Sequence, residues 1–78
     1  MPYDITINFL KNKIKHHKLE GPDIDHILYM FSEIKEMENK PKAGRWIGWC
    51  LKALENIGII TNNDSRFLIK KDVEEGNE

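Results

Sequence analysis

Hydrophobic positions recur at helical spacing in the first part of the chain. Asp4 is of a residue type that caps helix N-termini, and apolar residues follow it three or four positions apart. This pattern predicts a first helix over about residues 4 to 17. Gly21 and Pro22 end the short segment that follows this helix, because proline lacks a backbone donor and glycine relaxes the backbone. The apolar stripe consists of Tyr3, Ile5, Ile7, Phe9, Leu10 and Ile14.

A second amphipathic segment begins at Asp23 and predicts a helix over about residues 23 to 38. Asn39, Lys40 and Pro41 interrupt it. Its apolar face is formed by Ile24, Ile27, Leu28, Phe31, Ile34 and Met37. The opposite face carries Asp25, Ser32, Glu33 and Glu36.

A third helix is predicted from about Ala43 to Ile57. Gly58 follows the last apolar residue, where a left-handed C-cap favours glycine. Gly44 and Gly48 lie on one stripe of this helix, where they either let a neighbouring helix approach closely or leave room for a partner's side chain. On a helical wheel of about 100° per residue, one broad arc holds Trp46, Ile47, Cys50, Leu51, Ala53, Leu54 and Ile57, and it is predicted to be core.

The segment after Gly58 predicts a β-hairpin. It reads "IIT", then the turn-forming "NNDS", then "RFLIK", which is typical of two short strands joined by a tight turn. Val73 ends the hairpin, and residues 74–78 are expected to form a flexible acidic tail. The predicted fold is therefore α+β and mainly helical: a single small domain, residues 1–73, of three helices and a C-terminal β-hairpin.

Two phrases resemble known families. The order of three helices and a hairpin, with "LKALENIGIIT" at the junction, resembles the winged-helix fold. The resemblance implies that the phrase contains the end of a recognition helix and the first strand of a wing, although the second helix is longer than that family usually has. "KAGRWIGW" is similar to a phrase in small accessory proteins of tailed bacteriophages, with Cys50 and Leu51 in place of their usual Gln-Gly, and it implies a viral origin.

The length and the charge of the chain limit the range of possible functions. A chain of 78 residues buries a modest core, which disfavours a deep catalytic pocket, and a net charge of −1 gives no overall attraction to nucleic acid or anionic membranes. The charges are nevertheless segregated, so that either oppositely charged helices pair or a basic patch binds an anion. The basic cluster is Lys11, Lys13, Lys15, His16, His17 and Lys18, and the acidic residues are Asp23, Asp25, Glu33, Glu36, Glu38, Glu74, Glu75 and Glu78.

The location expected from the sequence is the cytoplasm, that of the host if the protein is viral. The longest apolar run is far below the roughly 20 residues of a membrane span, and the N-terminal residues lack the features of a signal peptide. A single cysteine excludes an internal disulfide and a site with several thiolates.

Side chains with catalytic or metal-binding chemistry form no recognisable pattern. His16 and His17 are adjacent and point about 100° apart on a helix, so a site that joins one of them to Asp23 and His26 is disfavoured against solvated histidines. Cys50 lies on the apolar arc and is expected to pack as a small hydrophobe. No phosphate-binding glycine motif occurs. We therefore predict a non-enzymatic protein without a cofactor or metal.

Trp49 lies outside the core arc of the third helix, beside Arg45, Lys52 and Asn56. A large aromatic residue flanked by basic residues is typical of a binding hot spot. The alternative is that Trp49 packs under the hairpin or the N-terminal segment, with Arg45 stacked on its ring. The predicted binding residues are Arg45, Trp49, Lys52 and Asn56 on the third helix, Asn62, Asn63 and Arg66 on the wing, and Lys11, Lys15 and Lys18 as supporting cations.

Two functions follow from these residues. The winged-helix resemblance implies a DNA-binding regulator that uses the third helix and the hairpin. The alternative is an adaptor or inhibitor that binds a host protein through the Trp49 face. The protein is expected to be a monomer or a homodimer, the dimer through the Gly44 and Gly48 stripe.

Overall fold

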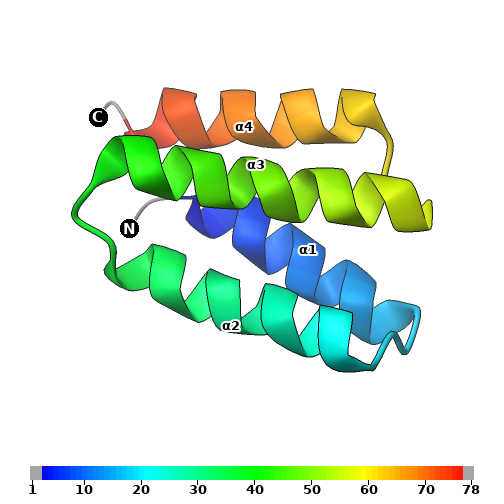
Figure 1. Cartoon of the computed structure of the whole chain (residues 1–78). Coiled ribbons are helices and arrows are strands. Elements are labelled where there is room, and N and C mark those ends of the chain that lie inside the picture. The colour runs from blue at the N-terminus through cyan, green and yellow to red at the C-terminus, as the bar shows by residue number, and fades with distance from the viewer. Residues whose placement is uncertain (1–2, 77–78) are drawn as a thin grey trace.

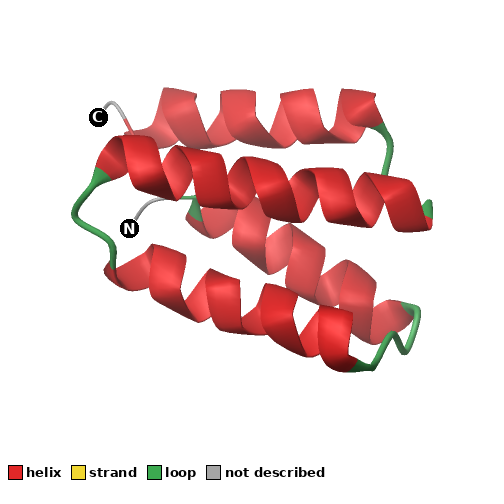
Figure 2. Cartoon of the chain, in the orientation of Figure 1, coloured by secondary structure: helices red, strands yellow, loops and turns green. Residues whose placement is uncertain are grey.

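Over residues 3–76 the chain folds into four helices that are connected by short turns (Figure 1). The computed structural model describes residues 3–76, in which α1 spans Asp4–His16, α2 spans Pro22–Glu36, α3 spans Lys40–Ile57 and α4 spans Asn62–Gly76. Only helices and loops occur within residues 3–76 (Figure 2). The prediction of an α+β, winged-helix-like fold with three helices and a C-terminal β-hairpin is therefore wrong.

The segment expected to turn between two strands is the start of α4. Thr61 Oγ1 accepts a hydrogen bond from the Asp64 backbone N–H at 3.1 Å, and Asp64 Oδ2 accepts one from the Thr61 N–H at 2.9 Å. This reciprocal pair is a capping box, which satisfies two backbone donors at the start of a helix. The helix then continues through residues 74–76, which were expected in a tail. Residues 77–78 of that tail lie outside the described residues.

The ends of α3 are set by local chemistry. Asn39 Oδ1 accepts a hydrogen bond from the Lys42 N–H at 3.0 Å and so caps the helix. Pro41 lies in the first turn, where a missing N–H is harmless because no acceptor in the helix faces it. The helix therefore begins at Lys40 and not at Ala43, the predicted start. Gly58 has φ 93° and forms the left-handed C-cap, as predicted.

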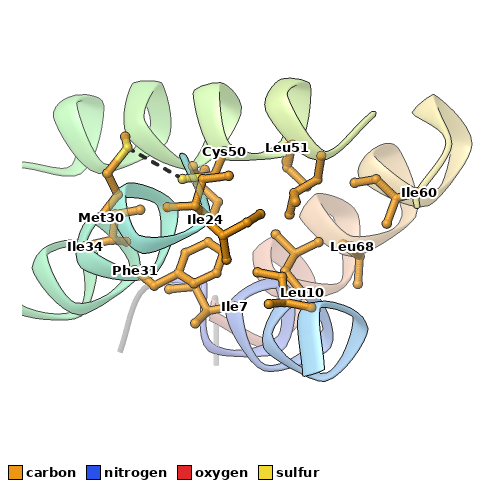
Figure 3. Packing of buried hydrophobic residues seen from close by; sticks show 14 of the residues in the cluster. Ile7, Leu10, Ile24, Met30, Phe31, Ile34, Cys50, Leu51, Ile60 and Leu68 are labelled. Atoms are coloured by element: carbon orange, nitrogen blue, oxygen red, sulfur yellow. Dashed lines mark hydrogen bonds between the residues drawn. The ribbon is translucent and has the colours of Figure 1, made fainter. Parts of the chain in front are cut away.

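The four helices alternate in direction and enclose one core (Figures 1 and 3). The closest pairs are α2 with α3 and α1 with α4, and α1 also contacts α2. The apolar stripes predicted for the first three helices face this core, except that Leu28 and Ile57 are exposed. The buried apolar residues are Ile7, Leu10 and Ile14 of α1, Ile24, Ile27, Met30, Phe31 and Ile34 of α2, Ala43, Ile47, Cys50, Leu51 and Leu54 of α3, Ile60, and Leu68 of α4.

A side chain of α4 caps α1. The α1 N-cap residue is Tyr3, which has a left-handed backbone and makes no side-chain capping bond. Instead, Asp72 Oδ1 accepts from the Ile5 N–H at 3.0 Å, and Asp72 Oδ2 accepts from the Thr6 N–H at 2.9 Å and from the Thr6 hydroxyl. Thr6 is fully buried. The Asp72 carboxylate therefore satisfies free donors at the positive end of the α1 dipole and ties α4 to α1.

The two glycines of α3 have different surroundings. A Cβ at Gly44 would lie 3.2 Å from the Tyr3 hydroxyl oxygen, so the glycine allows the start of α1 to approach α3 closely. A Cβ at Gly48 would meet nothing within 4 Å. Gly48 is exposed and shows no close packing within the described residues.

Candidate interaction surface

Three aromatic rings meet on the outer side of α2 and α3. The His26 ring of α2 lies edge-on to the Trp49 ring of α3, with centroids 5.5 Å apart and an interplanar angle of 90°. Tyr29 lies one turn further along α2, and its ring stacks on His26 at 6.3 Å. Trp49 remains 50% exposed and Tyr29 55% exposed. This is a large aromatic area left open to solvent and held in a defined geometry.

An open hollow of about 410 Å³ lies between the two helices at this position, and we call it the aromatic hollow. Its lining includes Met30, which is buried, and the half-buried Trp46. The Lys42 ammonium lies 5.3 Å from the centroid of the Trp46 ring. The residues that line the hollow are His26, Met30, Arg45, Trp46 and Trp49.

The position of Trp49 follows from its place on α3. Cys50 and Ile47 of the same helix are buried, and Trp49 is rotated about 100° away from Cys50 toward solvent and α2. The alternative in which Trp49 packs under a hairpin fails, because no hairpin exists within residues 3–76. Its edge-on aromatic contact is His26. The helical wheel put Trp49 outside the core arc but left open whether it is exposed or packed, and it did not identify the ring that contacts it.

The charges on the two sides of the aromatic hollow have opposite signs. Glu55 is the one carboxylate in α3, and it is directed at α4, where it accepts hydrogen bonds from Ser65 Oγ at 2.9 Å and from Asn62 Nδ2 at 3.4 Å. Lys35 is the one lysine in α2, and it is half-buried. The exposed charged groups of α3 are the cations Lys40, Lys42, Arg45 and Lys52, whereas the exposed carboxylates of α2 are Asp23, Asp25, Glu33 and Glu36.

Part of the predicted binding set gathers on the outer face of α3. Arg45, Trp49, Lys52 and Asn56 are all exposed there. The three residues assigned to a wing lie on α4 instead, so their predicted place on a hairpin is wrong. Asn62 and Asn63 are in the first turn of that helix, and Arg66 lines a separate shallow hollow of about 380 Å³ with Ser65, Ile69 and Lys70.

The predicted supporting cations lie elsewhere. Lys11 and Lys15 belong to α1, which packs against α2 and α4, and Lys18 lies in the turn after α1. Burial and, second, the like charge of Lys35 on α2 lower the pKa of Lys11. These three residues are therefore not brought together with the α3 cations to form one basic surface.

Cys50, His16 and His17 contact neighbouring side chains. Cys50 is buried with its sulfur 3.9 Å from the Met30 sulfur (Figure 3), and burial raises the pKa of its thiol to about 12. At neutral pH it is a packed thiol, as expected from the apolar arc. The His16 and His17 rings meet edge-on at 5.2 Å. Within residues 3–76, no group of three histidine, cysteine or carboxylate side chains is placed to hold a metal ion.

Comparisons with protein-family models, with curated proteins and with solved structures found no match to this chain. The similarity of "KAGRWIGW" to bacteriophage accessory proteins therefore stays a prediction. No helix within the described residues is both long enough and apolar enough to span a membrane.

Two residues of the surface were not among the predicted binding residues. His26 was considered only for metal binding, and Tyr29 was not singled out. The available signal was their spacing, because residues three apart on a helix lie on one face and both are outside the apolar stripe of α2. Which residues of α3 they meet depends on how the two helices pack.

Proposed function

We propose that this chain is a non-enzymatic protein-binding module and that the aromatic hollow is its contact surface. The observation that carries the proposal is the half-exposed Trp49 ring held edge-on against His26, beside Tyr29. Tryptophan, tyrosine and arginine are the residue types that contribute most to protein interfaces. Two tryptophans and Arg45 line this hollow, and Tyr29 stacks on His26 beside it.

The contact chemistry follows from the lining. An aliphatic or aromatic side chain of a partner would enter between Trp46 and Trp49 and bury apolar area on both rings and on Met30. Arg45 at the rim would donate to a partner's carboxylate or carbonyl. Ring contacts already hold His26, Tyr29 and Trp49 in place, so less side-chain freedom is lost on binding.

A protein partner fits this surface better than DNA. The DNA-binding hypothesis relied on a hairpin wing, and the residues assigned to that wing lie on α4. The hollow is also flanked on one side by the exposed carboxylates of α2, which repel a phosphate backbone. Both charge signs beside an apolar centre are ordinary in a protein interface.

The proposal is tested by selecting helical peptides from a random display library on the immobilised protein at low surface density. Selected peptides should lose about 30-fold in affinity for a Trp49→Ala variant, which corresponds to a hot spot of about 2 kcal/mol. Phe67→Ala is the matched control, because Phe67 is a 60% exposed aromatic residue on α4. It should bind the peptides as the wild type does.

Two results would contradict the proposal. Selected peptides that bind the wild type and Trp49→Ala equally well would show that the hollow is not the contact surface. Binding to duplex DNA that is strong at low salt, falls steeply with added salt and is lost in Arg45→Ala would favour the regulator hypothesis instead.

A further inference from the structure

We propose that the aromatic hollow is closed by a second copy of this chain, in a two-fold symmetric dimer in which α2 of each copy lies against α3 of the other. The inference rests on the proposed function, because it takes the same surface and names the protein that covers it. Three observations support it: the segregation of charge across the hollow, the register of α2 against α3, and the aromatic area left exposed.

A two-fold interface places one surface against itself, so that surface must be self-complementary. The surface around the hollow has this property. The exposed charges of α3 are all positive, and those of α2 are all negative. A two-fold axis that runs along the seam between the two helices puts the basic side of each copy on the acidic side of the other, with the aromatic rings at the centre.

The register of the helices specifies which charges would meet. α2 and α3 run antiparallel through the short connection of residues 37–39 (Figure 1), and His26 lies opposite Trp49. Glu33 follows His26 by seven residues, and Lys42 precedes Trp49 by seven, so Glu33 and Lys42 lie at the same height along the helices. Asp23 precedes His26 by three residues and Lys52 follows Trp49 by three, so these two also lie at one height, on the other side of the His26–Trp49 contact.

Rotation about an axis along the seam leaves height unchanged, so each position of α3 faces the position of α2 at the same height in the second copy. Lys42 would therefore face Glu33 of the second copy, and Lys52 would face its Asp23. Trp49 would face His26 of the second copy and cover the hollow. Because the operation is symmetric, each of these pairs occurs twice, and both exposed Trp49 rings are removed from solvent.

Other occupants complement this surface less completely. A uniformly acidic segment would suit α3 but would lie against the carboxylates of α2, and nucleic acid would meet the same repulsion. The occupant must carry basic groups on one side of an apolar centre and acidic groups on the other. This chain presents that pattern itself.

Sedimentation velocity over protein concentrations of about 1 to 500 µM tests the dimer, since a surface of this kind is expected to associate in the micromolar range. The wild type and Phe67→Ala should shift from monomer to dimer together as concentration rises. Trp49→Ala should need at least tenfold more protein to dimerise. Circular dichroism at low concentration confirms that each variant is folded. A wild type that stays monomeric throughout, or a Trp49→Ala variant that dimerises as readily, would overturn the proposal.

Charge reversal tests the predicted register. One variant carries Lys42→Glu and Lys52→Glu, so that acidic groups meet acidic groups at both predicted pairs, and the other carries Asp23→Lys and Glu33→Lys, so that basic groups meet basic groups there. Each alone should be monomeric at concentrations where the wild type is a dimer. An equimolar mixture should form heterodimers, because opposite charges again face each other. Dimers of either variant alone, or a mixture that stays monomeric, would overturn the proposed arrangement.

The peptide selection separates failure of the dimer from failure of the proposed function. At low surface density the immobilised copies do not meet. A monomeric wild type with Trp49-dependent peptides would overturn the dimer and leave the binding surface standing. A monomeric wild type with Trp49-independent peptides would overturn both.

Discussion

Replacing Asp72 by alanine removes the carboxylate that α4 supplies to the start of α1. The change leaves two backbone donors, those of Ile5 and Thr6, and the Thr6 hydroxyl without their acceptor, and the burial of Thr6 keeps water from replacing it. A hydrogen bond to a charged group is worth about 1.5 to 3 kcal/mol, and a lost N-cap costs about 0.5 to 2 kcal/mol. These contributions overlap, and we expect a loss of about 3 kcal/mol in the free energy of unfolding. For a domain of this size that loss lowers Tm by roughly 12 to 24 °C.

Urea unfolding followed by far-UV circular dichroism measures this loss. Glu74→Ala is the matched control, because it removes an exposed carboxylate from the same helix and should change stability by less than about 0.5 kcal/mol. Asp72→Asn keeps one acceptor oxygen and should lose about half as much as Asp72→Ala. Combining Asp72→Ala with Thr6→Val should cost less than the sum of the single changes, since the two residues share a hydrogen bond. A loss for Asp72→Ala no larger than for Glu74→Ala would refute the capping role.

Two further predictions concern α3. Gly48→Ala should raise the free energy of unfolding by about 1 kcal/mol, because Gly48 is exposed in a helix interior with open space around it. Gly44→Ala should gain less, because its Cβ would lie 3.2 Å from the Tyr3 hydroxyl, and equal gains in urea unfolding would contradict this account. The pKa of the Cys50 thiol is raised from 9.0 to about 12, so above pH 9 the unfolded chain releases a proton that the folded chain keeps. Stability should then fall with pH by at most about 1.4 kcal/mol per unit between these values, relative to Cys50→Ala. Parallel pH profiles for the two proteins would show that the buried thiol does not contribute.

The helical stripes of the first three segments could be predicted because each is long enough to show its period. The fourth could not be assigned in this way. Phe67, Leu68 and Ile69 are consecutive apolar residues, and a run this short fits a strand as well as a helix. The structure shows a helix here, in which Ser65 and Leu68, three residues apart, are both buried. Thr61 and Asp64 are residue types that favour both turns and helix caps, and their spacing of three was the signal for a capping box.

In the candidate surface, positions within one helix could be predicted from the sequence, whereas contacts between helices could not. The position of Trp49 on the outer side of α3 depends only on the helical period within one segment. Its contact with His26 depends on the register between α2 and α3, which is set by packing across the core. The contact of Asp72 with Thr6 is of the same kind, since it joins residues 66 positions apart. Contacts of this range have no local signal in a single sequence.

The link between Asp72 and the first turn of α1 also has a consequence for synthesis. Translation adds about 5 to 20 residues per second, whereas an isolated helix relaxes within about a microsecond. Because Asp72 comes 66 residues after Thr6, α1 waits for seconds on the ribosome without its cap and without the helix that covers one side of its apolar stripe. Maturation of the first helix is therefore timed by the emergence of the fourth.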